Sequence, residues 1–274
     1  MGRGTIRLSG LGVSNLGLRR SNNEDSFVVD EPAGLFLVAD GMGGAASGEL
    51  ASRLVADTIA HYVRHYLDRP LEDADRFDFF EGGQTPRGNT LLQAIHMANS
   101  LVYDASHQDN EHKGMGSTVA VLLLDDDHVL AANVGDSRIF RQRGDRLERL
   151  TVDHRLLDDP KMKGVIDPTG TIVSTMGNTL TRAMGVRREV QPDIRRLAVE
   201  DGDLFLLCSD GLSDMVEEEM IARVLGMDRS LDQKAKDLIE LALAGGGKDN
   251  VTVVLAAPQA AGRLKGLLNK ITGG

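Results

Sequence analysis

The stretch Leu35–Gly44, LFLVADGMGG, changes character halfway along its length. Five apolar residues typical of a buried strand lead to Asp40, and glycines follow that contribute no side chain to a core. The stretch Leu204–Asp214, LFLLCSDGLSD, repeats this pattern around Asp210. Two buried strands that each deliver an aspartate followed by a glycine predict rigid supports that present oxygen atoms to a metal ion.

Composition indicates a globular protein with an aliphatic core. Of the 274 residues, 41% are hydrophobic and only 4% aromatic, and tryptophan is absent. This length suits one large domain or two small ones. The net charge of -10, from 31 basic and 41 acidic residues, argues against a nucleic-acid or anionic-membrane partner, which it would repel. The negative charge is compatible with an enzyme that holds cations in carboxylate clusters.

The single cysteine and the short apolar runs indicate the compartment in which the protein is expected. Cys208 is the single cysteine, which rules out an internal disulfide and fits a reducing compartment. The N-terminal residues MGRGTIRLSG lack the apolar region of a secretory signal. No apolar run approaches the roughly 20 residues that a transmembrane helix needs. We expect a monomeric, cytoplasmic protein without a transmembrane segment.

Short apolar runs joined by polar, glycine-bearing turns favour antiparallel sheets over parallel units. The predicted strands cover residues 26–30, 35–39, 118–124, 129–134, 138–141, 204–208 and 251–256. Helical spacing of apolar residues predicts helices near 50–63, 91–102, 217–225 and 231–244. Strands fill the middle of the chain and helix pairs flank them, so we expect an α+β domain with a sheet-on-sheet core and helices outside.

Two segments lie outside this pattern. Residues 154–185 mix proline, glycine and charge, and we interpret them as a long surface excursion near the site. Residues 1–257 then form one domain, and 258–274 form a short basic amphipathic tail. The tail either packs back on its own domain or docks on a partner or a membrane surface.

Acidic residues occur where the predicted strands begin and end. Asp40 and Asp210 follow strands, Asp249 precedes one in KDNVTVVL, and Asp136 follows another in NVGDSR. In antiparallel sheets these positions share one edge, so the carboxylates converge and repel unless a cation neutralises them. Oxygen ligands without a His–Cys cluster suit Mg²⁺ or Mn²⁺, and the Gly41 carbonyl is a further ligand. A single Asp-Gly step is also typical of an ordinary turn. The combination of two Asp-Gly steps with two further aspartates at strand ends favours a metal site.

The stretch RRSNNEDSF, residues 19–27, brings further polar groups before a predicted strand. Arg20 offers a planar fork that binds phosphate oxygens in a bidentate manner. Glu24 or Asp25 is suited to hold metal-bound waters. Taken alone, the stretch also reads as a polar surface loop.

These motifs, taken in order, resemble the bacterial metal-dependent serine/threonine protein phosphatases of type 2C. The matching stretches are RRSNNEDS, VADGMGG, GSTVAVLL, ANVGDSR, LTVDH, LTRAMG, LLCSDGLSD and KDNVTVVL. The resemblance implies a four-layer αββα sandwich, in which helix pairs flank two packed antiparallel sheets. It also implies two Mn²⁺ or Mg²⁺ ions at one end and activity on phosphoserine and phosphothreonine.

The resemblance also implies roles for single residues. Asp40 would bridge both ions and Gly41 would give its carbonyl to one of them. Asp210 and Asp249 would hold the other ion. Asp136, sharing Asp210, looks like the ligand of a third ion in bacterial members.

Around the ions, Arg20 would grip the substrate phosphate, and Glu24 or Asp25 would support metal-bound waters. The segment 154–185 looks like the family's variable flap. A hydroxide that bridges the metals would attack phosphorus directly, and the enzyme would oppose a bacterial serine/threonine kinase acting on the same proteins. The chain departs from the family at Met42, where eukaryotic members carry histidine. It also departs just after GMGG, where many bacterial members carry histidine and this chain has Ala45 and Ala46. The proton donor to the leaving group is therefore open, with metal-bound water as one candidate.

Other readings fit less well. A cysteine phosphatase needs arginine six residues after its nucleophile, but Asp214 stands there after Cys208. A catalytically inactive regulatory or binding module of the same fold is the main alternative to an enzyme. Such a module would be expected to have lost its ligands, yet Asp40, Asp210 and Asp249 are present. A phosphatase of a partner-switching pathway is the alternative among enzymes.

Overall fold

The computed structural model describes residues 6–67, 83–108, 110–156 and 179–259, and they form two antiparallel sheets. The first sheet has the order β1 (Leu8–Asn15), β11 (Val251–Pro258), β10 (Leu204–Cys208), β7 (Arg138–Arg143) and β8 (Arg146–Arg149). The second has the order β2 (Asp25–Asp30), β3 (Leu35–Met42), β5 (Val119–Asp125), β6 (His128–Val134) and β9 (Asp193–Ala198), and β4 (Gly116–Ser117) pairs with the end of β3. The predicted antiparallel arrangement is confirmed.

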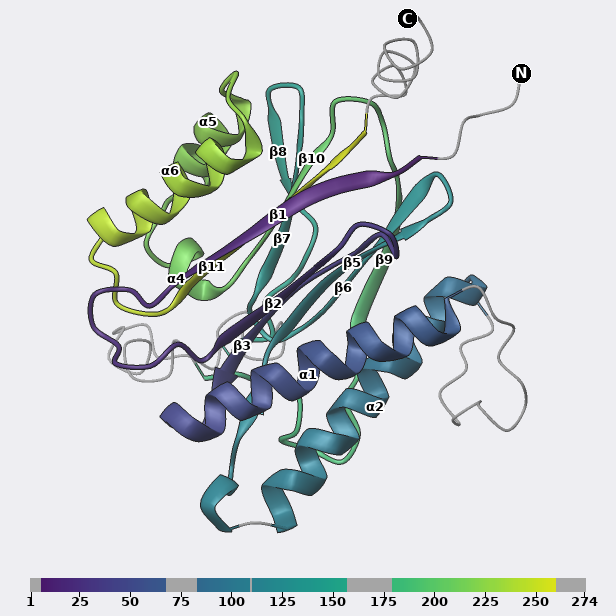
Figure 1. The fold of residues 1–274 in the computed structure, drawn as a ribbon, viewed down its shortest axis with the longest axis vertical. Coiled ribbons are helices and arrows are strands. Elements are labelled where there is room, and N and C mark those ends of the chain that lie inside the picture. The colour runs from purple at the N-terminus through teal and green to yellow at the C-terminus, as the bar shows by residue number, and fades with distance from the viewer. Residues whose placement is uncertain (1–5, 68–82, 109, 157–178, 260–274) are drawn as a thin grey trace, which may run out of the picture.

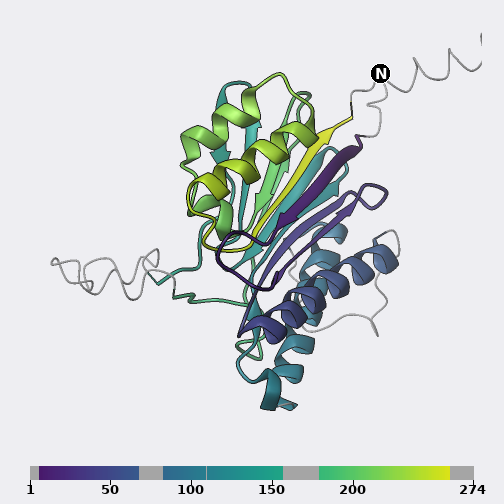
Figure 2. The same cartoon turned by 60° about the vertical axis from the view of Figure 1, so that its left-hand side comes forward.

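Helices cover the outer face of each sheet (Figures 1 and 2). The long helices α1 (Ala45–Tyr66) and α2 (Pro86–Gln108) pack on the second sheet, and the short turn η2 (Asn110–His112) follows α2. The helices α4 (Asp210–Ser213), α5 (Glu218–Gly226) and α6 (Leu231–Ala244) pack on the first sheet. The four layers are therefore helix, sheet, sheet, helix, as predicted.

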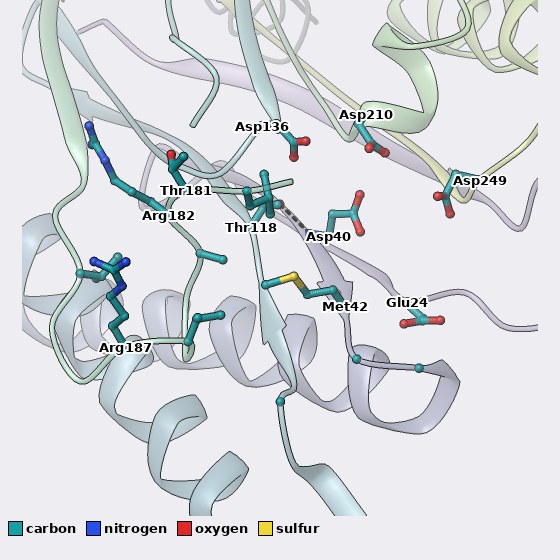
Figure 3. A pocket seen from close by; sticks show the side chains of 18 of the residues that line it. Glu24, Asp40, Met42, Thr118, Asp136, Thr181, Arg182, Arg187, Asp210 and Asp249 are labelled. Atoms are coloured by element: carbon teal, nitrogen blue, oxygen red, sulfur yellow. Dashed lines mark hydrogen bonds between the residues drawn. The ribbon is translucent and has the colours of Figure 1, made fainter. Parts of the chain in front are cut away.

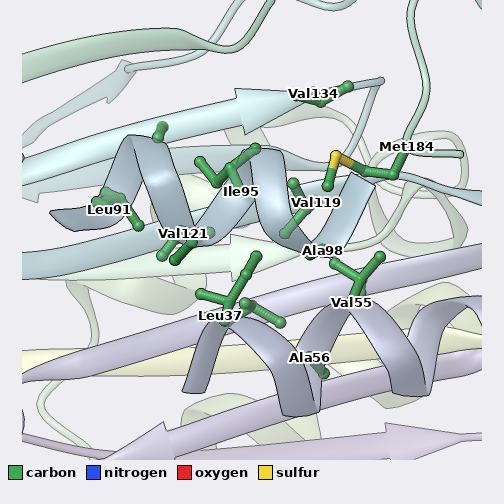
Figure 4. Close-up of a cluster of buried hydrophobic side chains, with 14 of the residues drawn as sticks. Leu37, Val55, Ala56, Leu91, Ile95, Ala98, Val119, Val121, Val134 and Met184 are labelled. Carbon is green, nitrogen blue, oxygen red and sulfur yellow. The ribbon is translucent and has the colours of Figure 1, made fainter. Parts of the chain in front are cut away.

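Strand β3 shows why its sequence is apolar without interruption. Leu37 faces α1 and α2, where it joins Val55 and Ile95 in one buried cluster (Figure 4). Phe36 and Val38 point the opposite way, into the layer between the two sheets. A strand buried on both faces loses the alternation of polar and apolar residues that a half-exposed strand shows.

Strand β10 is built in the same way on the other sheet. Leu204 and Leu206 pack against α5 and α6, whereas Phe205 and Leu207 fill the layer between the sheets. Fully burying one such side chain stabilises the fold by about 1.5–3 kcal/mol. Both strands are therefore rigidly held up to their aspartates, Asp40 near the end of β3 and Asp210 just after β10.

Strands β1, β8 and β9 are missing from the sequence-based assignment. Two glycines in β1 weaken its strand pattern, but both are needed for close packing. A Cβ at Gly10 would lie 2.4 Å from the Leu255 carbonyl oxygen, and one at Gly12 would lie 2.3 Å from the Phe27 ring. Strands β8 and β9 lie at sheet edges, where polar residues such as Arg195 and Arg196 remain partly exposed.

The two segments that lie outside the core pattern are only partly described. The tail 258–274 lies outside the described residues from 260 onward, and β11 runs through Pro258. In the excursion 154–185, the described ends pair with each other, because Arg155 and Leu180 form an antiparallel bridge. No helix in the described part of the chain is long and apolar enough to cross a bilayer.

Candidate metal and phosphate site

One cavity of about 820 Å³ collects the predicted aspartates. It opens where β3, β6 and β10 end and β11 begins, and Asp40, Asp136, Asp210 and Asp249 all line it. Figure 3 shows these four carboxylates on one side of the cavity, opposite Arg182 and Arg187. Arg20, Glu24 and Gly41 also belong to the lining. Asp25, by contrast, does not line the cavity.

Asp40 is fixed through its backbone. Its N–H donates to the Thr118 hydroxyl at 3.1 Å, and its carbonyl accepts from the Thr118 N–H at 2.8 Å and the Ser117 hydroxyl at 3.0 Å. Burial, followed by the charges of Asp25 and Asp210, raises the pKa of the Asp40 carboxyl well above its usual range. Several acids facing one buried carboxylate create a strong demand for a cation.

Asp25 is the direct cross-strand neighbour of Asp40. Its Oδ2 accepts hydrogen bonds from the Ser209 hydroxyl at 2.8 Å and the Thr252 hydroxyl at 2.6 Å. Its Oδ1 is buried without a hydrogen-bond partner. Burial raises the pKa of Asp25 to about 6. An unpartnered buried carboxylate oxygen beside Asp40 fits a water or cation in the site.

Asp210 begins helix α4 directly after β10. The turn requires glycine next, since a Cβ at Gly211 would lie 1.9 Å from the Asn250 carbonyl oxygen. Burial, followed by the charges of Asp136 and Asp214, raises the pKa of Asp210 to about 8. The Asp-Gly step is thus both a tight turn and the support of a carboxylate that resists ionisation on its own.

Asn250 ties the loop that carries Arg20 and Glu24 to the start of β11. Its side-chain oxygen accepts from the Glu24 N–H at 2.8 Å, and its amide donates to the Leu16 and Asn22 carbonyls at 2.9 and 3.0 Å. No sequence pattern indicates a role for Asn250, although it directly follows Asp249. An amide that both donates and accepts is the side chain able to close such a junction.

Arg20 and Glu24 reach the cavity from this loop. Arg20 donates to the Asp249 carboxylate at 2.6 Å and remains half-exposed. Glu24 is buried, and burial raises its pKa, while the charge of Arg20 acts in the opposite direction. A Cβ at Gly48 would lie 1.8 Å from the Glu24 carboxylate, so glycine there admits Glu24 beside helix α1.

Arg155 is a site residue that sequence reasoning missed. Its Nε donates to Asp136 at 2.6 Å, and its two Nη atoms reach Asp214 at 3.2 Å. Burial alone would lower the pKa of Arg155, but the charges of Asp136 and Asp214 outweigh burial and raise it. Its partners lie 19 and 59 residues away in the chain, so no local motif reveals the cluster.

The donor set at Asp40, Asp210 and Asp249 fits hard divalent ions, since it consists of carboxylate oxygens and the Gly41 backbone. Among the described residues, no three His, Cys, Asp or Glu side chains are grouped closely enough to hold an ion as they stand. Ion binding therefore requires the carboxylates to draw together. No histidine stands among the described residues that line the cavity.

Comparison with known proteins agrees with the resemblance seen in the motifs. The family model described as Protein phosphatase 2C matches residues 18–241, which is most of the chain. The matched region begins before Arg20 and contains Asp40, Asp136 and Asp210. Asp249 lies beyond it.

Relatives that match most of this chain carry phosphatase names. The chain is 30% identical over 249 residues to the protein phosphatase PhpP of Streptococcus pneumoniae serotype 2, covering 89% of this chain and 95% of that protein. It is 36% identical over 259 residues to the serine/threonine protein phosphatase PstP of Mycobacterium tuberculosis, covering 93% of this chain and 46% of PstP. The crystal structure of a PstP catalytic domain in complex with two manganese ions matches with a TM-score of 0.76 and 34% identity, covering 93% of this chain and all of that one.

Proposed function

The chain belongs to the protein phosphatase 2C family, whose named relatives are serine/threonine protein phosphatases, and from this premise we propose that it hydrolyses phosphoserine and phosphothreonine in proteins. The observation that carries the proposal is the gathering of Asp40, Asp210 and Asp249 on one cavity, with the unpartnered Asp25 oxygen close by. Carboxylates in this number would destabilise the fold unless cations bound them.

Two divalent ions, Mn²⁺ or Mg²⁺, are the cofactors that this donor set suits. Asp40 and the Gly41 carbonyl would hold them at the end of β3, and Asp210 and Asp249 would hold them from the facing sheet. When bound, such ions supply an activated water that attacks phosphorus, and they polarise the phosphate oxygens. The strands β3 and β10 hold the backbone that carries these ligands, and the carboxylate side chains would draw together on the ions.

The protein's own side chains bind and orient the reactants. Arg20, half-exposed beside Asp249, is placed to turn its guanidinium toward a phosphate group and stabilise charge on its oxygens. Glu24, in the cavity lining, and Asp25, whose Oδ1 is buried without a partner beside Asp40, would accept hydrogen bonds from ordered waters. We infer that the leaving alkoxide takes its proton from water, because no histidine stands among the described residues of the cavity lining.

We further propose that the substrates are targets of a bacterial serine/threonine kinase and that the enzyme works as a cytoplasmic monomer. The single cysteine, Cys208, has no partner for an internal disulfide, which supports a reducing compartment. It is also buried, and burial raises its pKa to about 12. It therefore has no role as a nucleophile.

Hydrolysis of a phosphothreonine peptide, measured with Mn²⁺ and with excess chelator, tests the proposed function. We expect turnover with Mn²⁺, none with chelator, and recovery when Mn²⁺ is restored. The variant Asp145→Asn, in an exposed turn, serves as a matched control and should behave as wild type. Full activity in chelator would contradict the metal requirement, and inactivity in every condition would favour the binding-module alternative.

A further inference from the structure

We propose that Arg155 is the resident cation of the cluster formed by Asp136, Asp210 and Asp214, and that it excludes a third divalent ion from Asp136. The proposal rests on the proposed function only in taking the neighbouring ions at Asp40 as the catalytic ones. It departs from the expectation of a third ion at Asp136, because a guanidinium already pairs with that carboxylate.

The contacts of Arg155 engage all three carboxylates. Nε lies 2.6 Å from Asp136 Oδ2, and both Nη atoms lie 3.2 Å from Asp214 Oδ1. Nη2 also lies 3.5 Å from Asp210 Oδ2. One planar cation thereby uses donors on all three nitrogens, and Oδ2 of Asp136, one of the two oxygens that an ion at Asp136 could bind, already accepts a hydrogen bond from the guanidinium.

Burial makes it difficult for a metal ion to displace the Arg155 guanidinium. The side chain of Arg155 is 10% exposed and that of Asp136 is 6% exposed. An ion that displaced the guanidinium would leave Arg155 as an unpaired buried charge, which is a costly state. An ion that bound without displacing it would face a positive charge at close range.

The backbone fixes Arg155 beside the cluster. Arg155 and Leu180 form an antiparallel bridge, the Leu156 N–H donates to the Thr179 carbonyl at 2.8 Å, and the Thr181 N–H donates to the His154 carbonyl at 2.7 Å. The guanidinium is therefore presented from a paired segment. Thr181 also lines the cavity, so the same pairing connects this segment to the catalytic site.

Counting bound Mn²⁺ tests the proposal without measuring activity. Wild type, Arg155→Ala, Arg155→Ala/Asp136→Asn and the control Arg182→Ala would be equilibrated with Mn²⁺, and metal per chain measured by atomic emission. Arg182 lines the same cavity but pairs with Asp193 instead of the cluster. We expect Arg155→Ala to bind one more ion than wild type, the double variant to lose it again, and Arg182→Ala to match wild type.

The outcomes separate this proposal from the proposed function. An Arg155→Ala protein that binds no additional ion overturns the proposal, and so does an additional ion that persists in the double variant. Wild type that binds no Mn²⁺, together with an ion gained by Arg155→Ala, would remove the proposed function and leave this proposal standing.

A second variant covers the case in which Arg155→Ala does not fold, as judged by circular dichroism. Asp136→Asn alone should leave the ion count of wild type unchanged, because Asp136 binds Arg155 in place of a metal. Loss of an ion from Asp136→Asn would show that Asp136 is a metal ligand and would overturn the proposal.

Discussion

Two arginines neutralise acids of the same cavity, and they differ chiefly in burial. Arg20 contacts Asp249 at 2.6 Å with the two side chains 48% and 34% exposed, and Arg155 contacts Asp136 at the same distance with 10% and 6% exposed. Solvent screens the first pair and readily replaces either partner, whereas separating the second pair leaves a buried charge. This difference in exposure supports the proposals that Arg20 exchanges its carboxylate for phosphate and that Arg155 acts as a fixed counter-ion.

The largest difference between the two pairs should appear in stability. Arg155→Ala leaves Asp136 buried without its cation, so we expect a loss of about 3 kcal/mol in the free energy of unfolding. Arg20→Ala should cost less than about 1 kcal/mol, because its pair is exposed. Urea unfolding in chelator at neutral pH measures both, and equal losses would remove the distinction between the pairs.

Asp210 lies near Arg155 and lines the same cavity as Asp249. Of the substitutions considered, its replacement should reduce the catalytic rate most. Asp210→Asn removes a proposed metal ligand, so we expect turnover of para-nitrophenyl phosphate with Mn²⁺ to fall by about 100-fold or more. The fold should persist, because the carboxyl already resists ionisation in its buried position. A near-normal rate with an unchanged melting temperature would show that Asp210 has only a structural role and is not a metal ligand.

Arg20→Ala should weaken phosphate binding and have less effect on turnover. We expect KM to rise by about tenfold, because one charge-assisted contact to the substrate is lost. Arg53→Ala provides the matched control, since Arg53 is an exposed arginine of α1 paired with Glu49. Steady-state kinetics with a phosphothreonine peptide separates KM from kcat, and an unchanged KM would exclude the phosphate-binding role.

The smallest predicted effect is on the pH dependence of Mn²⁺ binding. Burial raises the pKa of Asp210 to about 8 and that of Asp25 to about 6, so both carboxyls gain protons as the pH falls from 8 to 6. Protons and metal compete for these oxygens, and affinity for Mn²⁺ should therefore rise as the pH is raised from 6 to 8. Isothermal titration calorimetry at several pH values measures this, and a flat profile would contradict it.

The sequence predicts those parts of the fold whose side chains are buried on both sides. Strands β3 and β10 stand out because helices and the facing sheet cover their two faces. Strand β1 does not stand out, because Gly10 and Gly12 are selected for close approach to Phe36 and Phe27 of the other sheet. Such a requirement exists only once the two sheets are packed together.

The residues of the candidate site likewise divide into those that the sequence predicts and those that it does not. Asp40 and Asp210 are predicted because each follows a strand within one short motif. Arg155 and Asn250 are not, because their work is to join segments that are distant in the chain. The pattern of strand ends locates the acids, whereas the partners that neutralise and position them depend on tertiary contacts.

The central claim is that divalent ions bind at Asp40, Asp210 and Asp249, at the margin of β3 and β10, and that none binds at Asp136 beside Arg155. Anomalous scattering from crystals soaked in Mn²⁺ tests it most directly, because it locates each ion. The account predicts two peaks, about 4 Å apart, beside Asp40, Asp210 and Asp249, and none between Asp136 and Arg155. Peaks confined to other positions, or no peak beside Asp40, would contradict it.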